Sequence, residues 1–258
     1  MLWPLWHRAS EAKRSDRLIV DPLAVELINR IDYDFQASFG KPSVFHPIRA
    51  RFGDDLINSF LTRYEHRACV VALGEGLETQ YWRLGEPDIP WISVDVPEAI
   101  TVRERLLPGS DQMKLVPLSA LDLSWMDHVP QGRVPFISAM GLLMYFKEHE
   151  VHGLLTAIAE RFPEAQISFD TIPEYFSLKT LQGYNVTRTY VAPPMPWGIS
   201  IDDLGDFLDT LPNIADWTVQ TYAQPFPKIL RLYWLLGHIG PIRRKFAPAL
   251  AHLSIADR

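Results

Sequence analysis

The stretch VVALGEGLETQYWRL, residues 70–84, decides the fold, because a short apolar run meets two glycines within it. The run begins slightly earlier, as ACVVAL at 68–73, and its continuous apolar character is typical of a strand buried on both faces. Gly74 and Gly76 follow, and glycine lets the backbone turn tightly and approach a ligand closely. A helix is expected from about Glu78. The stretch therefore predicts a strand, a glycine loop and a helix in succession.

Strand and helix patterns alternate on both sides of this stretch. Upstream, DDLINSFLTRYEHR (54–67) places its apolar side chains on one helical face. Downstream, strands are expected at 91–96, 114–119, 135–140 and 165–172, and helices are expected from Pro97 and over 148–162. This alternation predicts an α/β fold with a mostly parallel, doubly wound sheet.

The character of the chain changes beyond Ile172. The proline-rich segment APPMPWG (192–198) predicts a loop, and Ser200 is suited to cap the helix that follows it. A strand is expected near 217–223, followed by a C-terminal helical segment that includes 229–240. No repeat or flexible linker interrupts the chain, which predicts a single domain over 1–258. Its expected parts are a helical N-terminal cap (1–67), a cofactor-binding core (68–172), and a lid and acceptor-side region that completes the sheet (173–258).

Composition limits the partners and the compartment. A chain of 258 residues that is 47% hydrophobic can bury a full core as one large domain. Its net charge of −6, with Lys and Arg dispersed, argues against nucleic acid as a partner. The single cysteine, Cys69, cannot form an internal disulfide and is expected to be a small buried hydrophobe in a cytoplasmic protein. Neither a signal peptide nor a membrane span is indicated. The sequence carries no signal for an oligomeric state.

Asp95 indicates what the glycine loop binds. In a doubly wound sheet, ligands lie outside the carboxyl ends of the strands. Asp95 ends the second predicted strand, 21 positions after Gly74, where a carboxylate can accept both hydroxyl hydrogens of a ribose. Together with the loop, Asp95 predicts a nucleoside cofactor. The alternative is an ordinary strand-to-helix turn.

The charge of the loop separates two cofactors. A dinucleotide presents its pyrophosphate to the start of a helix, where two carboxylates, Glu75 and Glu78, would repel it. The third glycine of a dinucleotide fingerprint is also missing, because position 79 is Thr. S-adenosylmethionine has no phosphate and carries an ammonium and a sulfonium. The loop therefore favours this methyl donor over NAD, and a NAD-dependent dehydrogenase is the less favoured alternative. Glu75 and Glu78 could instead simply cap the helix.

Several segments of the chain resemble one known family. The matching segments are RLIVDPLAVELI (17–28), RARFGDDLI (49–57), VVALGEGLETQYWRL, WISVDVPEAITVRERLLP (91–108), LSALDLSWMDHVP (118–130) and FISAMGLLMYF (136–146). In order and spacing they resemble the leucine carboxyl methyltransferase superfamily, and particularly its bacterial branch similar to the polyketide O-methyltransferases. The resemblance covers roughly residues 5–172. It implies a Rossmann-like class I methyltransferase fold and S-adenosylmethionine-dependent O-methylation of a small-molecule hydroxyl or carboxylate.

The resemblance also implies cofactor-binding residues. Arg49 matches the arginine that pairs with the cofactor carboxylate, which a guanidinium can bind through both oxygens. Arg51 is its less favoured neighbour. A basic residue nearer the N-terminus also reaches this carboxylate in relatives, with Arg8 and Lys13 as candidates. Gly74 and Gly76 match the glycine loop, and Asp95 matches the ribose-binding acid.

At the adenine, the resemblance implies that the Asp122 carboxylate accepts from the exocyclic amine and that Leu123 packs on the ring. Without the family, Asp122 could only cap a turn before Trp125. Met140, where many relatives have Glu or Gln, is expected to line the cofactor site or to end its strand in the core.

Three positions of the loop depart from the family pattern. Glu75 stands where relatives have a small residue, Glu78 where they have aspartate, and Gln80 where they have arginine. Glu75 and Met140 keep open a second hypothesis, a catalytically silent S-adenosylmethionine-binding regulatory protein.

The second half of the chain is expected to supply the acceptor pocket. Tyr145, Tyr175 and Trp197 are the candidate substrate-contacting aromatics, and simple packing is the alternative for each. Tyr145 is also the candidate catalytic residue, although the sequence identifies no general base. His149 and His152 are three residues apart on a helix but have no third ligand, so no metal site is predicted. The sequence does not identify the acceptor.

Overall fold

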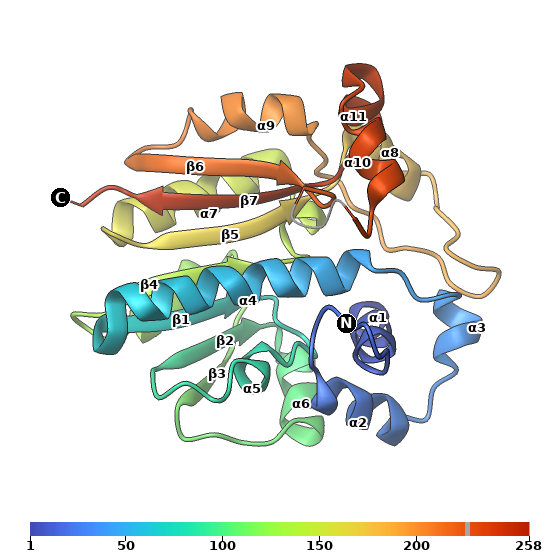
Figure 1. Ribbon diagram of the computed structural model, residues 1–258. Helices are drawn as coiled ribbons and strands as arrows, with labels where there is room; N and C mark the ends of the chain where they lie inside the picture. The colour runs from blue at the N-terminus through green and yellow to red at the C-terminus, as the bar shows by residue number, and fades with distance from the viewer. Residues whose placement is uncertain (225–227, 258) are drawn as a thin grey trace.

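A single mixed sheet organises residues 1–224 and 228–257, which the computed structural model describes (Figure 1). Its strand order is β3-β2-β1-β4-β5-β7-β6. The strands are β1 (Ala68–Leu73), β2 (Trp91–Asp95), β3 (Met113–Pro117), β4 (Val134–Ala139), β5 (Gln166–Thr171), β6 (Ile214–Thr221) and β7 (Ala249–Ile255). The helices are α1 (Leu2–Ala12), α2 (Pro22–Arg30), α3 (Phe35–Phe39), α4 (Phe45–Tyr64), α5 (Gln80–Arg83), α6 (Pro97–Leu106), α7 (Glu148–Arg161), α8 (Glu174–Leu181), α9 (Ile201–Leu208), α10 (Arg231–Leu236) and α11 (Gly240–Phe246).

The predicted α/β fold is confirmed. Strands β1 to β5 pair in parallel, and β1 lies between β2 and β4. The strand order therefore reverses between β1 and β4, which is where ligands bind in sheets of this type. Strand β7 runs antiparallel to both β5 and β6. None of the described helices is long and apolar enough to cross a bilayer.

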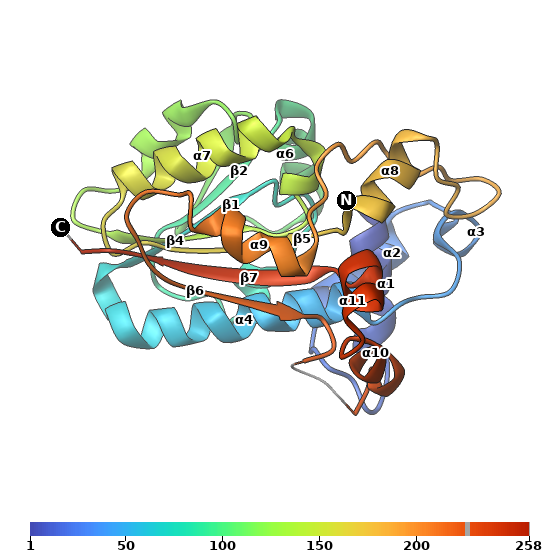
Figure 2. The same cartoon turned by 90° about the horizontal axis from the view of Figure 1, so that it is seen from above.

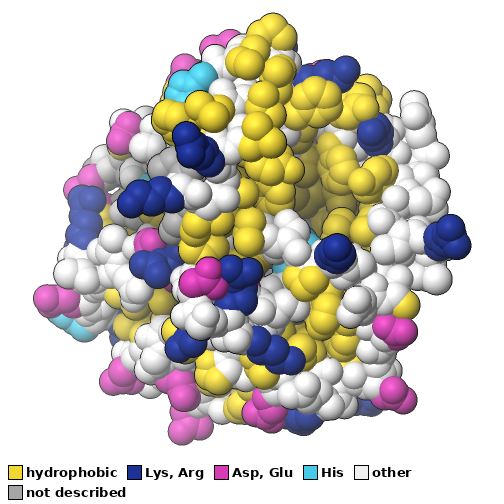
Figure 3. Space-filling model, turned by 45° about the vertical axis from the view of Figure 1, so that its right-hand side comes forward, with side chains coloured by type: hydrophobic (Ala, Val, Ile, Leu, Met, Phe, Trp, Pro, Cys, Tyr) yellow, Lys and Arg dark blue, Asp and Glu magenta, His cyan; other side chains and the backbone are white. Residues whose placement is uncertain are grey.

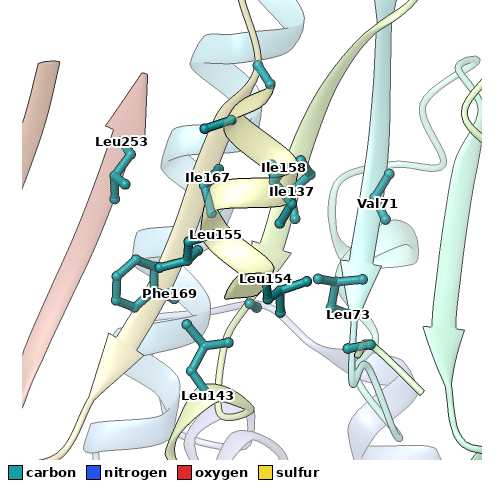
Figure 4. Packing of buried hydrophobic residues seen from close by; sticks show 14 of the residues in the cluster. Val71, Leu73, Ile137, Leu143, Leu154, Leu155, Ile158, Ile167, Phe169 and Leu253 are labelled. Carbon is teal, nitrogen blue, oxygen red and sulfur yellow. The ribbon is translucent and has the colours of Figure 1, made fainter. Parts of the chain in front are cut away.

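Strand β1 is buried along its whole length because helices cover both of its faces. Val71 and Leu73 share one core cluster with residues of α7, whereas Val70 shares another with residues of α4 and α5. Figure 4 shows Val71 and Leu73 on the side of the sheet occupied by Leu154 of α7. The strand's continuous apolar sequence matches this two-sided burial. Cys69 is buried in the first cluster, as expected, and burial raises the pKa of its thiol to about 12.

The N-terminal segment, predicted as a helical cap over 1–67, covers both the end of the sheet and one of its faces. Helices α1, α2 and α3 lie beyond the carboxyl ends of the parallel strands, whereas the long helix α4 lies along one face of the sheet (Figures 1 and 2). Helix α7 covers the opposite face (Figure 2). The helix expected from Glu78 is only the short α5, which starts at Gln80.

The C-terminal part differs most from expectation. The Ser200 cap is confirmed, because its side chain accepts from the Asp202 backbone N–H. The expected helix over 229–240 is interrupted, since α10 ends at Leu236 and α11 begins at Gly240. The expectation that the chain ends in a helical segment is wrong, because strand β7 follows and fills the gap between β5 and β6. No short stretch of the sequence indicated that β7 would pair with β5 and β6, which are distant from one another in the chain.

Candidate functional site

A cavity of about 1140 Å³ opens at the carboxyl ends of the parallel strands. Figure 3 shows the hollow on this side of the molecule, with walls made mostly of hydrophobic side chains. The lining includes residues from the ends of β1, β2, β4 and β5 and from helices α1, α4, α8 and α11. Eleven residues singled out from the sequence line it, namely Arg8, Arg49, Gly74, Glu75, Gly76, Glu78, Gln80, Asp95, Met140, Tyr145 and Tyr175.

The glycine loop has the backbone that its sequence predicts. Gly74 and Gly76 have φ angles of 62° and 53°, in the left-handed region that favours glycine. The Gly74 N–H donates to the carbonyl of Val94 at 2.8 Å, which ties the loop to β2. A Cβ at Gly74 would lie 2.6 Å from Cδ1 of Leu142, so a larger residue would displace the segment after β4. The loop is therefore closely packed on the floor of the cavity.

Asp95 is oriented by two backbone donors. Its Oδ2 accepts from the Gly76 N–H at 2.8 Å, and its Oδ1 accepts from the Val96 N–H at 2.8 Å. A carboxylate offers about four acceptor sites, so each oxygen keeps capacity for a further donor. The carboxylate is thus pre-oriented at the cavity wall and suited to bind a pair of hydroxyl groups.

Glu75 does not offer its charge to the cavity. Its Oε2 lies 3.0 Å from Nη2 of Arg103, and Trp91 Nε1 donates to its Oε1 at 3.3 Å. Nη1 of Arg103 also donates to the carbonyls of Gly76 and Glu78, at 2.8 and 2.9 Å. Burial raises the pKa of Glu75, an effect that Arg103 only partly offsets. The pair is therefore a buried support beneath the loop.

Glu78 is paired as well. Its two oxygens lie 2.8 Å from Nη1 of Arg8 and 2.7 Å from Nη1 of Arg83. Although burial alone would raise the pKa of Glu78, the two guanidinium groups lower it to about 2. The interpretation of the loop as an acidic surface that repels phosphate is therefore wrong, because Arg8, Arg83 and Arg103 neutralise the two glutamates. The missing third glycine remains an argument against a dinucleotide.

The same buried network joins the N-terminal helices to the loop. Arg8 Nε lies 3.2 Å from Asp21, and Thr79 Oγ1 donates to the same carboxylate. Arg83 Nε lies 2.6 Å from Asp54 of α4. Arg8 lines the cavity, but its charge is used within this network. Lys13, the other basic candidate, is exposed and does not belong to the described lining.

Arg49 holds together the other side of the cavity. Its Nη1 lies 3.0 Å from Oδ2 of Asp170, and the Tyr222 hydroxyl donates to the same oxygen at 2.8 Å. The backbone N–H of Gly141 donates to Oδ1 of Asp170. Asp170 outweighs the effect of burial and raises the pKa of Arg49. Sequence reasoning missed Asp170 and Tyr222, although an aspartate near the end of a predicted parallel strand is a recognisable signal.

Of the three aromatic residues expected in the acceptor pocket, two line the cavity and one does not. Tyr145 and Tyr175 line the cavity, and the ammonium groups of Lys179 and Lys245 lie 4.5 and 4.7 Å from the Tyr175 ring centroid. Trp197 does not line it: the side chain is 2% exposed and packs in the core. The hypothesis that Trp197 contacts an acceptor is therefore wrong, since the loop before α9 folds its indole inward.

Asp122 and Leu123 lie at the surface, outside the described cavity lining. Asp122 Oδ1 accepts from the Ser124 backbone N–H at 3.1 Å and from its hydroxyl at 2.7 Å. The capping alternative is therefore realised in the structure, and the adenine-binding role of this pair stays a prediction. Arg51 is likewise outside the lining and pairs with Asp55 on the surface of α4.

The sequence profile described as leucine carboxyl methyltransferase matches residues 2–159. The chain belongs to the leucine carboxyl methyltransferase family. The resemblance inferred from the sequence motifs is thereby confirmed. A curated relative, the tetracenomycin polyketide synthesis O-methyltransferase TcmP of Streptomyces glaucescens, is 32% identical over 175 residues. The match covers 67% of this chain and 64% of TcmP, just under two thirds of that enzyme.

Two solved structures share the fold. A candidate methyltransferase from Thermobifida fusca YX superposes with a TM-score of 0.60 at 14% identity, covering 100% of this chain and 95% of that one. The plantazolicin methyltransferase BamL, solved with a triazolic desmethylPZN analogue and SAH, gives 0.55 at 11% identity, covering 98% and 96%. At these identities the likeness extends to the fold alone. It agrees with the Rossmann-like methyltransferase fold expected for the family.

Proposed function

We propose that the protein is an S-adenosylmethionine-dependent methyltransferase that methylates an oxygen of a small molecule, either a hydroxyl or a carboxylate. The observation that carries the proposal is the placement of Asp95, fixed by the Gly76 N–H at the carboxyl end of β2. Membership of the family supports the reaction class. The O-methyltransferase activity of TcmP supports oxygen as the acceptor atom.

The residues of the cavity fit this cofactor. Asp95 has acceptor capacity for the two ribose hydroxyls. Arg49 uses Nη1 on Asp170 and has further N–H groups with which to bind the cofactor carboxylate. Gly74 and Gly76 permit close approach of the backbone, and Met140 can pack against the bound molecule without a polar contact. When bound, S-adenosylmethionine supplies an electrophilic methyl group on a sulfonium.

The protein's main contribution to such a reaction is position. Methyl transfer is an in-line displacement, so the acceptor oxygen has to be held close to the methyl carbon, at about 3 Å, and shielded from water. The apolar cavity walls support both requirements. Its volume of about 1140 Å³ exceeds that of ordinary small-molecule sites, which leaves room for an acceptor beside the cofactor.

Calorimetry tests the proposal. The protein is expected to bind S-adenosylhomocysteine and not NAD, and Asp95→Ala is expected to weaken that binding by tenfold or more, about 1.4 kcal/mol or greater. Asp127→Ala is the matched control, because Asp127 is a surface aspartate whose side chain is 76% exposed. Unchanged S-adenosylhomocysteine affinity in Asp95→Ala would show that the cofactor site is not at Asp95. Transfer of a labelled methyl group to a metabolite extract then tests turnover, and NAD binding without S-adenosylhomocysteine binding would refute the proposal.

A further inference from the structure

A chain of three aromatic side chains ends in the cavity wall formed by α1 and α4. His7 of α1 and His46 of α4 both line the cavity, and histidine is visible within the hollow in Figure 3. Their Nδ1 atoms are 2.6 Å apart. Trp3, one helical turn before His7, donates from its indole Nε1 to His7 Nε2 at 3.0 Å. The hydrogen-bonded order is therefore Trp3, His7, His46.

The indole fixes the tautomer of both imidazoles. Trp3 Nε1 is a donor only, so His7 Nε2 has to be the acceptor. A neutral imidazole carries one N–H, which places the hydrogen of His7 on Nδ1. That N–H donates to His46 Nδ1, so the hydrogen of neutral His46 is on Nε2. Among the described residues no hydrogen bond reaches His46 Nε2, which leaves this N–H as the polar group that His46 offers to the cavity.

The pair is held in the neutral state. A proton added to His7 Nε2 would face the Trp3 N–H, and one added to His46 Nδ1 would face the His7 N–H. The surroundings act in the same direction: burial and the Arg49 charge lower the pKa of His7 to about 4 and that of His46 well below its usual range. Arg8 and the N-terminal amino group are further cations that lower the pKa of His46, and the carboxylate of Asp170 is engaged by Arg49.

His46 lies on the outer side of the cofactor-binding residues. It precedes Arg49 by three residues on α4. The two residues therefore lie on the same side of the helix, about 4.5 Å apart along its axis. Arg49 reaches the end of β5 through Asp170, whereas α4 begins beyond the carboxyl ends of the parallel strands, close to α1 (Figure 1). The His46 ring is enclosed by other rings, with the His7 centroid 4.7 Å and the Trp3 centroid 5.6 Å from that of His46. In such partly buried surroundings, a hydrogen bond from an N–H to an anion is stronger than it would be in water.

We propose, on the basis of the proposed function, that His46 Nε2–H binds the methyl-acceptor oxygen, in a donor tautomer that Trp3 sets through His7. His46 is then unable to accept a proton at Nε2. Methylation of a hydroxyl releases a proton and methylation of a carboxylate does not. The acceptor that suits this donor is therefore an oxygen that is already ionised at neutral pH, as in a carboxylate. Trp3 and His7 act as positioning residues.

Nitrogen NMR of the whole protein, labelled on its histidine rings, tests the tautomers without any acceptor. The spectra are expected to show His7 with its hydrogen on Nδ1 and His46 with its hydrogen on Nε2, assigned from His7→Gln and His46→Gln. Trp3→Phe keeps the apolar stacking on Phe39 but removes the donor. It is expected to give a mixture of tautomers at His7. A hydrogen on His46 Nδ1 in the wild type, or unchanged tautomers in Trp3→Phe, would overturn the relay.

Binding of benzoate and benzyl alcohol to the protein loaded with S-adenosylhomocysteine tests the acceptor class. Benzoate is expected to bind more tightly than benzyl alcohol, and His46→Phe is expected to weaken benzoate at least about tenfold. His46→Gln, whose amide nitrogen can replace Nε2, is expected to restore most of that affinity. Thermal unfolding of each variant checks the fold.

The outcomes separate this proposal from the one it rests on. Equal benzoate affinity in His46→Phe and the wild type overturns the assignment, as does a preference for benzyl alcohol. Weaker S-adenosylhomocysteine binding in a folded His46→Phe places His46 at the cofactor instead and also overturns it. Failure of the wild type to bind S-adenosylhomocysteine refutes the proposed function, whereas the tautomer measurement stands independently.

Discussion

The buried pair of Glu75 and Arg103 makes a quantitative prediction. Replacing Glu75 by Gln keeps an acceptor for Trp91 Nε1 but leaves the Arg103 guanidinium without its counter-charge, and Arg103 is only 1% exposed. Breaking a buried pair by removing one partner costs about 3–5 kcal/mol. Arg103 would keep its two backbone carbonyl acceptors, so we expect the lower end, about 3 kcal/mol. For a chain of this size that corresponds to roughly 6–12 °C in Tm.

A double-mutant cycle separates the pair from the packing around it. Burial raises the pKa of Glu75 even beside Arg103, so desolvation offsets much of the attraction within the pair. Arg103→Met alone would leave the Glu75 carboxylate buried without a cation. The double variant Glu75→Gln with Arg103→Met removes both charges. It is therefore expected to be at least as stable as Arg103→Met, with a coupling energy of about 2 kcal/mol or more.

Urea unfolding followed by circular dichroism measures these stabilities, and calorimetry measures affinity for S-adenosylhomocysteine below the unfolding transition. Because Glu75 faces Arg103, we expect Glu75→Gln to change that affinity by less than about threefold. Two results would refute the reasoning. One is a stability loss in Glu75→Gln below about 1 kcal/mol, and the other is a tenfold change in cofactor affinity without a loss of stability.

Two further predictions concern Gly141 and Glu78. Gly141→Ala would put a Cβ 2.6 Å from Nη1 of Arg49 at a φ of 75°, so S-adenosylhomocysteine affinity is expected to fall about tenfold by calorimetry. The control is Gly132→Ala, at a φ of 78° with open space around it. It is expected to lose only about 1–2 kcal/mol of folding stability from backbone strain. Equal losses of S-adenosylhomocysteine affinity in both variants would exclude a role for Arg49. Because the folded pKa of Glu78 is about 2, below its usual value of 4.5, its stabilisation of about 3 kcal/mol is complete above pH 4.5 and is lost as the pH falls towards 2. Urea unfolding of Glu78→Gln should accordingly lack that pH dependence, and an unchanged profile would show that another group controls it.

The parallel half of the fold could be predicted because its signals are local. Strand β1 matches its predicted range of 68–73, and β2, β4 and β5 lie within one residue of theirs at each end, since a fully buried strand reads as a continuous apolar run. Strand β7 carried no comparable signal. It is the last strand in the chain, yet it lies between β5 and β6, and only that distant pairing makes ALAHLSI a strand. Long-range pairing of this kind is not encoded in any short window.

The candidate site was predictable where a residue's role depends on its own backbone. The positive φ angles at Gly74 and Gly76, and the position of Asp95 at a strand end, follow from the local pattern. The charge state of the loop did not follow. Glu75 is compensated by Arg103 and Glu78 by Arg8, and the sequence gives no indication that these side chains meet. Composition around a loop is therefore a poor guide to its electrostatics when its carboxylates are buried.

This compensation bears on the hypothesis of a silent binding protein. That hypothesis depended on Glu75 in the glycine loop and on Met140 after β4. Met140 lines the cavity, whereas Glu75 belongs to the buried network, where it pairs with Arg103. Substitutions on that side of the loop change how it is held more than what it presents to the cavity. The departure at Glu75 is therefore expected to affect stability first, and it gives no reason to expect loss of methyl transfer.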